Sequence, residues 1–361
     1  MSVALERLKL NETNSVRIPA ADLHKQVSAI LQGVGTPVDH AEITAKILVS
    51  ASLRGVDTHG VGNAAGYSRL IENGTYTVPQ TVEVISETGT TALLSCGNGI
   101  GFIGAHRGME ISIEKAGKTG LGMTTIRDGH HIGMAGYYAM MALEHDMIGI
   151  AMTNAVPAVR PALGARSMLG TNPIAFAAPA GEERDFVLDM ATSTVASGKI
   201  ALARRLGVPI PEGWVITAEG EAITEPPGGM GDHWTMNPLG GTREQGSHKG
   251  YGLSVMVDIL CGVLSGGGFS SQLATGENMT WTMAIAISKF RDVDDFKAMM
   301  DDMIRELHAT PTLPGADGVL VAGDPEADAA DDRMANGVPV ENSQYDEMRR
   351  RAAELDVELF I

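Results

Sequence analysis

Two adjacent histidines, His130 and His131, are the residues whose type and position best suit proton transfer. A β-type run, Met123–Ile126, ends in a polar turn before them, and an apolar helical segment after them leads into a second β-type run, Ile148–Asn154. An imidazole with an unperturbed pKa of about 6.5 exchanges a proton near neutral pH. Strand ends hold side chains rigidly while the adjoining loop leaves them accessible, so the sequence predicts chemistry at this junction.

A second set of candidate residues lies where an earlier predicted helix ends. The helix that begins after Pro37 runs into the segment Arg54-Gly-Val-Asp-Thr-His-Gly-Val61. Glycines on both sides of Asp57, Thr58 and His59 give the backbone freedom to present those side chains. The alternative is an ordinary helix end with a capping aspartate, and the local sequence leaves both interpretations open.

Asp189 and Lys249 are candidates later in the chain. A short β-type run from Phe186 ends at Asp189, which is either a helix N-cap or a partner that holds the tautomer of His131. Lys249 stands at a predicted helix start, where it is either a phosphate or carboxylate contact or a solvated surface charge. Before it, the Gly- and Pro-rich stretch 211–248 is irregular and long enough to be an active-site lid or a dimer arm.

A glycine motif at Gly99–Gly104 matches the dinucleotide fingerprint G-x-G-x-x-G, and a helix-like run follows it to Ala116. A fingerprint should begin directly at the end of a strand, yet Gly97-Asn98 intervenes here. No clean acidic ligand for a ribose appears about 20 residues further on. The sequence therefore favours an ordinary helix start over a Rossmann pyrophosphate site.

The remaining pattern supplies the elements that must position these residues. It predicts a half-buried strand at Val82–Glu87, an apolar strand at Ile174–Ala178, a buried helix at Leu253–Leu264, a helix at Val293–His308, an acidic loop at Pro311–Asp332 and a last amphipathic helix near Gln344–Leu355. There is no internal repeat and no low-complexity tract.

Composition limits the class of protein. With 361 residues, 44% hydrophobic and 20% charged, the chain suits two packed units or one large unit with an appendage. A net charge of −17 argues against nucleic acid as a partner, because phosphate binding needs clustered Lys and Arg. Any anionic substrate must therefore be attracted by a local positive group.

The small number of cysteines and the lack of long apolar stretches predict the cellular setting. Cys96 and Cys261 are too few for a disulfide framework or a Cys-based zinc site, which favours reduced thiols in the cytoplasm. The N-terminus lacks the apolar core of a signal peptide. Apolar stretches are interrupted well before the about 18 residues of a transmembrane span, so no membrane partner is expected.

Six blocks, each weak alone, occur together in one order. They are Arg54-Gly-Val-Asp-Thr-His-Gly60, Arg127-Asp-Gly-His-His-Ile-Gly133, Gly170-Thr-Asn-Pro173, Asp189-Met-Ala-Thr-Ser193, Ser197-Gly-Lys199 and Lys249-Gly-Tyr-Gly252. In these blocks the chain resembles the type 2 malate/L-lactate dehydrogenase family over nearly its whole length. That family includes ureidoglycolate, sulfolactate and diketogulonate dehydrogenases or reductases and the cyclic imino-acid reductases.

The resemblance implies an α/β fold that is not a Rossmann fold. A mixed, largely antiparallel sheet flanked by helices would carry the nicotinamide cofactor, NAD or NADP. A helical domain built from both chain ends, residues 1–75 and 325–361, would bind substrate and dimerise, and residues 76–324 would form the cofactor domain. Members are homodimers or larger assemblies, so a homodimer is expected here.

The resemblance also implies a role for each matched residue. His131 matches the catalytic histidine, which removes the hydroxyl proton of a 2-hydroxy acid as hydride leaves C2 for the nicotinamide. His130 falls where the family commonly has Asn and is the less suitable base. Arg54 matches the arginine that grips the substrate carboxylate through two parallel hydrogen bonds. His59 matches a second histidine that orients substrate.

Departures from the family's pattern leave substrate and cofactor choice open. Thr58 replaces a usual Ser, Ala155 replaces a Ser that can face the cofactor, and Gly323-Asp324 replaces a Gly-Glu turn. The full predicted set is His131, Asp189 and His59 for catalysis; Arg54, His59, Thr58, Thr171 and Asn172 for substrate; and Asp189, Met190, Ala191, Lys249, Gly250, Ala155, Gly323 and Asp324 for cofactor.

The leading hypothesis is reversible hydride transfer between NAD(P)H and a small 2-oxo acid. The nearest alternative is an NADPH-dependent reductase of the C=N bond in a cyclic imino acid, with Asp189 acting through water. A metal-dependent lyase or hydrolase using His59, His130 and His131 is disfavoured, because adjacent histidines point in divergent directions and no His-x-x-Glu-His helix occurs. A catalytically inactive binding protein is disfavoured because the matched site residues are retained together.

Overall fold

A seven-stranded mixed sheet with strand order β2-β3-β4-β11-β5-β6-β7 carries the fold. The structure, a computed structural model, describes residues 7–229 and 233–361. Strands β3 and β4 run parallel, and the other neighbouring pairs in this sheet are antiparallel. A Rossmann sheet is mostly parallel, so the prediction of a non-Rossmann, largely antiparallel fold is confirmed.

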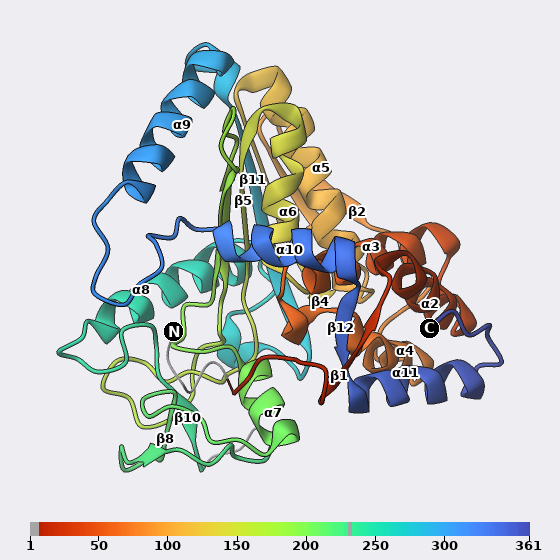
Figure 1. The fold of residues 1–361 in the computed structure, drawn as a ribbon. Coiled ribbons are helices and arrows are strands. Elements are labelled where there is room, and N and C mark those ends of the chain that lie inside the picture. Colours follow the sequence, from red (N-terminus) through yellow and green to blue (C-terminus); the bar gives the residue numbers. More distant parts are fainter. Residues whose placement is uncertain (1–6, 230–232) are drawn as a thin grey trace.

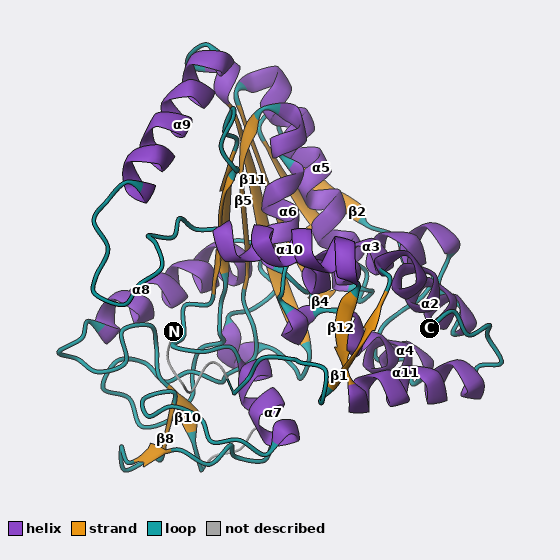
Figure 2. Cartoon of the chain, viewed as in Figure 1, coloured by secondary structure: helices purple, strands orange, loops and turns teal. Residues whose placement is uncertain are grey.

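Helices lie on both sides of this sheet (Figures 1 and 2). The strands of the sheet are β2 (Glu83–Glu87), β3 (Thr91–Ser95), β4 (Leu121–His130), β5 (Met147–Thr153), β6 (Ile174–Ala178), β7 (Phe186–Met190) and β11 (Glu277–Ala286). The main helices are α2 (Ala20–Gly33), α3 (Val38–Leu53), α4 (Ala64–Glu72), α5 (Gly101–Thr119), α6 (Ala135–Met141), α7 (Ser197–Leu206), α8 (Ser247–Val257), α9 (Val293–His308), α10 (Asp324–Asn336) and α11 (Asn342–Glu354). Helices α5 and α6 contact the central strands directly.

The two ends of the chain meet in a second, two-stranded sheet. Strand β1 (Ser15–Ile18) pairs antiparallel with β12 (Val338–Glu341). Helix α11, which follows β12, then packs against α2 and α4 (Figure 1). Both chain ends therefore contribute to one helical group, although the domain boundaries at residues 75 and 325 stay predictions, because a single hydrophobic core continues from this group into α5 and α6.

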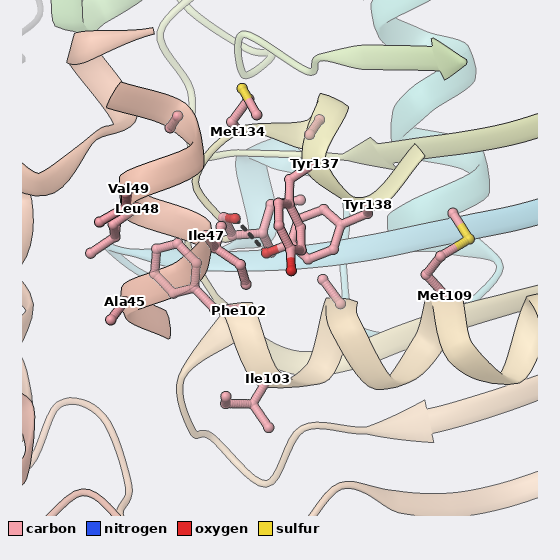
Figure 3. Packing of buried hydrophobic residues seen from close by; sticks show 14 of the residues in the cluster. Ala45, Ile47, Leu48, Val49, Phe102, Ile103, Met109, Met134, Tyr137 and Tyr138 are labelled. Atoms are coloured by element: carbon pink, nitrogen blue, oxygen red, sulfur yellow. Dashed lines mark hydrogen bonds between the residues drawn. The ribbon is translucent and has the colours of Figure 1, made fainter. Parts of the chain in front are cut away.

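Phe102 connects that core to the candidate catalytic residue. Its fully buried ring lies beside Ala45, Ile47 and Leu48 of α3 (Figure 3). The rings of Phe102 and His131 also meet edge-on, with 6.4 Å between their centroids. Since a buried aromatic ring in a close-packed core has little freedom to move, the core fixes one side of the His131 imidazole.

The glycine motif at Gly99–Gly104 begins helix α5, as predicted. A Cβ atom on Gly101 would lie 1.9 Å from the backbone oxygen of His130, so only glycine lets the helix start this close to the end of β4. The backbone N–H of Ile100 donates to Oε1 of Gln80 at 2.6 Å. A side chain of the protein thus occupies the helix start where a pyrophosphate would have to bind.

Two predicted burial patterns are wrong. Strand β2, which lies at the edge of the sheet, is exposed along its whole length. The helix expected at Leu253–Leu264 begins earlier as α8 and continues as a π-helix, Asp258–Val263, and the side chains of Ile259 and Val263 are more than half exposed. An apolar run alone does not reveal which of its faces a neighbour covers.

The described residues of the irregular stretch 211–248 include three two-residue strands. They are β8 (Val215–Ile216), β9 (Ala222–Ile223) and β10 (Thr235–Met236), and they form a small sheet in the order β10-β8-β9. Residues 230–232 of the stretch lie outside the described part of the chain. Whether the stretch acts as a lid or a dimer arm stays a prediction.

The acidic loop expected at Pro311–Asp332 is wrong for its second half, which begins helix α10. Pro325 lies in the first turn, where its missing N–H costs no helical hydrogen bond, and acidic residues near a helix N-terminus are stabilising. In Figure 1, α10 runs from the edge of the sheet toward α3. The C-terminal part of the chain therefore reaches the segment that carries Arg54 and His59.

Arg333 on α10 makes that connection. Its guanidinium donates two hydrogen bonds to the carboxylate of Asp57, one of them at 3.0 Å, and another to the backbone oxygen of Ser52. Arg333 and Asp57 are only 13% and 23% exposed. Asp57, which the sequence left open as either a presented site residue or a helix cap, is thus half of a largely buried ion pair.

Arg333→Met is expected to lower the free energy of unfolding by about 1–3 kcal/mol, because it leaves the Asp57 carboxylate without its charged partner. Urea unfolding measures the change. The matched control is Arg17→Met, which removes an ion pair to Asp332 whose two members are about half exposed, so its effect should stay within about 1 kcal/mol. Equal effects of the two substitutions would contradict a structural role for the Arg333–Asp57 pair.

Candidate active site

His131 is the first residue after strand β4. The strand runs on through Arg127 and Asp128, which were expected to form a turn, and ends at His130 opposite Glu277 of β11. The central strand pairing therefore extends up to the histidine itself. This explains how a residue outside regular structure can be held in one place.

The His131 ring has one engaged nitrogen and one available nitrogen. Its Nδ1 lies 2.6 Å from the hydroxyl of Tyr67 on α4, and the backbone N–H of Gly133 points at the same nitrogen from 3.4 Å. Within residues 7–229 and 233–361, no hydrogen bond engages Nε2. Nε2 is therefore the nitrogen that can face a ligand.

His130 is held differently from its neighbour. Its Nδ1 lies 3.0 Å from the backbone oxygen of Gly276, its Nε2 lies 3.1 Å from Oδ1 of Asn98, and its ring stacks on Tyr76 at 4.2 Å. The side chain is also buried. His130 therefore anchors the end of β4 to three other segments, and neither of its nitrogens is available to a substrate.

His59 and Thr58 lie next to His131, although they come from the segment after α3. The imidazole rings of His59 and His131 stack with 5.3 Å between centroids and 23° between planes. The Thr58 hydroxyl lies 2.9 Å from Nδ1 of His59. Across the described residues, Nε2 of His59 has no hydrogen-bond partner. The fold thus brings two imidazoles with available Nε2 atoms side by side.

Both imidazoles are neutral at pH 7. Burial lowers the pKa of His131 to about 3, with His59 a smaller cause, and burial lowers the pKa of His59 to about 4. A protonated ring would have to give up most of its hydration in this position. Two neutral rings can stack without charge repulsion, which fits the observed geometry.

These lowered pKa values make stability depend on pH. The unfolded chain binds a proton at each histidine near pH 6.5, whereas the folded protein resists protonation until about pH 4 at His59 and about pH 3 at His131. Their contribution is therefore complete above pH 6.5 and is lost as the pH falls toward 3. The free energy of unfolding should fall less between pH 7 and pH 4 in His131→Asn than in the wild type. Urea unfolding at several pH values tests this, and parallel curves would contradict it.

Arg54 is a partly buried cation at the start of the same segment. Burial lowers the pKa of its guanidinium, while the charges of Glu326 and Asp189 act in the opposite direction. In the part of the chain that the structure describes, no hydrogen bond or ion pair within 4 Å engages this guanidinium. Arg54 can therefore offer its fork of N–H donors to a carboxylate.

Asp189 lies at the end of β7 and contacts the first turn of α6. Its Oδ2 accepts a hydrogen bond from the backbone N–H of Gly136 at 2.7 Å, and a Cβ atom on Gly136 would lie only 2.8 Å from that oxygen. Burial raises the pKa of Asp189 to about 6, with the Gly136 N–H opposing the shift. The carboxyl group can therefore gain or lose a proton close to neutral pH.

The side chain that holds His131 is Tyr67 and not Asp189, so that alternative for Asp189 is wrong. Tyr67 was missed in the sequence analysis. It is a single tyrosine on a short helix, and no spacing relates it to a histidine 64 residues away. Only the packing of α4 against the end of β4 brings the two together.

Asn172 joins several of the predicted cofactor and substrate segments. Its side chain is fully buried, accepts from the backbone N–H of Ala155 at 3.1 Å and donates to the backbone oxygen of Ser254 at 3.0 Å. The hydroxyl of Thr192, just after Asp189-Met190-Ala191, donates to the backbone oxygens of Thr171 and Asn172. Ligand contacts by these residues stay predictions, but the structure brings their segments together.

The last predicted cofactor residues lie on two other segments. Lys249 is exposed in the first turn of α8, and Gly250 is buried against Leu239, whose backbone leaves no room for a Cβ atom. The carboxylate of Asp324 is engaged by His308 and by the backbone N–H of Val321. Among the described residues, no hydrogen bond or ion pair links either segment to the histidines.

The turn before α10 adjoins β7, the strand that carries Asp189. The backbone oxygen of Ala322 accepts from the N–H of Val187, and Gly323 has a φ of +104°. A Cβ atom on Gly323 would lie 3.1 Å from the Val187 nitrogen. The predicted Gly323-Asp324 turn is thus next to the strand of one predicted cofactor segment.

No group of three or more His, Cys, Asp or Glu side chains that could hold a metal ion occurs in residues 7–229 and 233–361. His59 and His131 stack on each other, and no third ligand of this kind lies beside them among those residues. In the same residues, no helix is both long enough and apolar enough to cross a membrane.

Comparisons with known proteins identify the family of the chain. The family model described as malate/L-lactate dehydrogenase matches residues 18–349. A malate dehydrogenase from Pyrococcus abyssi is 40% identical, covering 96% of this chain and 97% of the relative.

Solved structures extend the comparison to the fold. The malate dehydrogenase of Pyrococcus horikoshii OT3 has a TM-score of 0.90 at 35% identity, covering 97% of this chain and 98% of that one. The delta1-piperideine-2-carboxylate reductase of Pseudomonas syringae has a TM-score of 0.82 at 25% identity, covering 93% and 100%. On this match over nearly its whole length, the chain belongs to the malate/L-lactate dehydrogenase family.

Proposed function

We propose that this protein catalyses reversible hydride transfer between a nicotinamide cofactor and a small 2-hydroxy or 2-oxo acid. One observation carries the proposal. Within the described residues, no hydrogen bond or ion pair engages the Arg54 guanidinium or Nε2 of His131, and the segment that Arg54 begins places His59 against His131. A 2-oxo acid has a carboxylate beside a carbonyl oxygen, so a cation and an imidazole nitrogen complement its two polar groups.

Each residue then has a defined task. Arg54 binds the substrate carboxylate, His131 exchanges a proton with the hydroxyl or carbonyl oxygen at C2, and His59 and Thr58 orient the substrate. Asp189, with a pKa raised by burial to about 6, supports the movement of protons. The positive charge of Arg54 would also attract an anionic substrate, which the net charge of −17 on the chain would otherwise repel.

The family's nicotinamide cofactor is assigned here to the residues that match its cofactor-binding blocks. Lys249 is an exposed cation, and in the described chain no hydrogen bond or ion pair engages its ammonium group, so it can take a phosphate. Asp189, Met190, Ala191, Ala155, Gly250, Gly323 and Asp324 complete the proposed cofactor set. When bound, NAD or NADP would accept hydride in oxidation and supply it in reduction.

A second candidate is reduction of a C=N bond in a cyclic imino acid. Two observations favour keeping it: the piperideine-carboxylate reductase among the structural relatives, and an Asp189 carboxyl that can carry a proton near neutral pH. In that reaction Arg54 would bind the same kind of carboxylate. Asp189, acting through water, would replace His131 as the acid.

Activity assays with a set of substrates and both cofactors distinguish the two candidate reactions. Purified protein is given NADH or NADPH with 2-oxo acids, including the oxo acids of malate, lactate and sulfolactate, with and without methylamine, and separately with cyclic imines. Oxidation of malate, lactate, ureidoglycolate and sulfolactate is tested with NAD and NADP. Turnover of a 2-oxo acid without amine supports the proposal, whereas turnover of imines alone supports the second candidate. We also propose a homodimer, which sedimentation of the same protein tests.

A further inference from the structure

The hydroxyl of Tyr67 has a single partner in the described chain, the Nδ1 atom of His131 at 2.6 Å. The tyrosine side chain is buried, with 8% of its surface exposed. Burial also raises the pKa of Tyr67 far above its usual value. The group is therefore a neutral O–H that is directed at one imidazole nitrogen.

The backbone decides which of the two atoms donates. The N–H of Gly133 points at the same Nδ1 from 3.4 Å, and an amide N–H can only donate. An Nδ1 atom that faces this donor carries a lone pair, so the Tyr67 hydroxyl must donate as well. The single proton of the neutral ring then sits on Nε2.

We propose that Tyr67 is a positioning residue that fixes His131 in the tautomer with its proton on Nε2. This inference rests on the proposed function for its consequence: His131 presents an N–H donor to the carbonyl oxygen of a 2-oxo acid. The resting site is thereby arranged for reduction: the oxygen that forms at C2 takes the Nε2 proton, and Nε2 regains a proton from solvent, so the ring returns to its neutral state. To accept a proton from an alcohol, the ring must first change tautomer: Nε2 releases its proton to solvent, Nδ1 takes one up, and the Tyr67 hydroxyl turns so that it accepts from Nδ1–H.

This arrangement is the opposite of the one that a carboxylate partner creates. A carboxylate accepts from Nδ1–H and leaves a lone pair on Nε2, which prepares the histidine as a base. A neutral hydroxyl that donates to Nδ1 prepares the same ring as a hydrogen-bond donor. With Tyr67 as the partner of Nδ1, the resting His131 ring therefore carries its proton on Nε2.

The hydroxyl can be removed while the ring is kept. The Tyr67 ring meets Phe102 edge-on at 5.2 Å and stacks near Tyr76 at 6.5 Å, and phenylalanine preserves both contacts. Tyr138 supplies a matched control, because its buried hydroxyl donates to the backbone oxygen of Ile132 at the same distance of 2.6 Å, one residue away from His131.

Nitrogen NMR of the histidine rings tests the tautomer directly. Protein is labelled with ¹⁵N-histidine, and the His131 signals are assigned by their loss in His131→Asn. The wild type at pH 7 should have a protonated Nε2 and an unprotonated Nδ1. In Tyr67→Phe the two shifts should move toward each other, and in Tyr138→Phe they should stay. A wild-type ring with its proton on Nδ1, or an unchanged spectrum in Tyr67→Phe, would overturn the proposal.

Kinetics tests the consequence separately. In Tyr67→Phe, kcat for reduction should fall roughly 5- to 10-fold, the worth of one hydrogen bond, while cofactor affinity and the kcat of Tyr138→Phe stay near wild type. Unchanged turnover in Tyr67→Phe would remove the positioning role. The wild-type spectrum needs no substrate, and His131→Asn serves only to assign its signals, so it decides the tautomer even if the proposed reaction is wrong.

Discussion

His131→Asn is expected to reduce turnover about 10²- to 10⁴-fold, the range in which a positioned general acid or base contributes. Asparagine can still form a hydrogen bond to the substrate oxygen, but it cannot exchange a proton with it near neutral pH. The affinity for the cofactor should change little, because His131 is assigned to the substrate. Steady-state turnover together with a fluorescence titration of NADH or NADPH measures both quantities.

A second histidine of the same region provides the control for this prediction. His145 is exposed between α6 and β5, so His145→Asn should keep wild-type turnover and stability. Thermal unfolding of both variants separates a loss of chemistry from a loss of fold. A His131→Asn protein that is folded and turns over at the wild-type rate would exclude His131 as the acid or base.

Arg54→Lys is expected to raise the KM for the 2-oxo acid roughly 10- to 100-fold. Hydrogen bonds to charged groups contribute about 1.5–3 kcal/mol, and every 1.4 kcal/mol corresponds to about a tenfold change in affinity. Lysine keeps the charge of Arg54 but is a point donor that cannot reproduce two parallel hydrogen bonds to a carboxylate. Initial rates over a range of substrate concentrations, at saturating cofactor, measure the change.

Arg107→Lys is a matched control, because Arg107 is an exposed arginine on α5 whose ion pair, among the residues that the structure describes, is with Glu110 one helical turn away. It should leave KM unchanged. If Arg54→Lys weakened the binding of the cofactor and left the KM for the substrate unchanged, Arg54 would be a cofactor-binding residue. If it altered neither, its charge would serve chiefly to balance Asp189 and Glu326, the two carboxylates whose charges act on its pKa.

Regular elements with a strong local pattern could be predicted from the sequence. The predicted strand at Ile174–Ala178 and helix at Val293–His308 match β6 and α9, because periodicity and helix-start residues are local properties. The start of α10 was missed because its residues are mostly polar, with no apolar face to mark a helix. The exposure of β2 was missed because it depends on what lies beside the strand.

The candidate site divides in the same way. The sequence by itself determined the residue types and their local setting: His131 at a strand end, His59 and Thr58 in a glycine-flanked turn, and the order of six blocks that points to one family. These are properties of short segments, and a short segment largely sets its own backbone conformation.

The tertiary structure alone decided the partner of each of these groups. In it, His59 stacks on His131, and Nδ1 of His131 meets the hydroxyl of Tyr67 rather than Asp189. Asp57 pairs with Arg333, which is far away in the sequence. Hydrogen bonds, tautomers and pKa values depend on atoms within a few ångströms of a group. Those atoms come from remote segments, and only folding places them there.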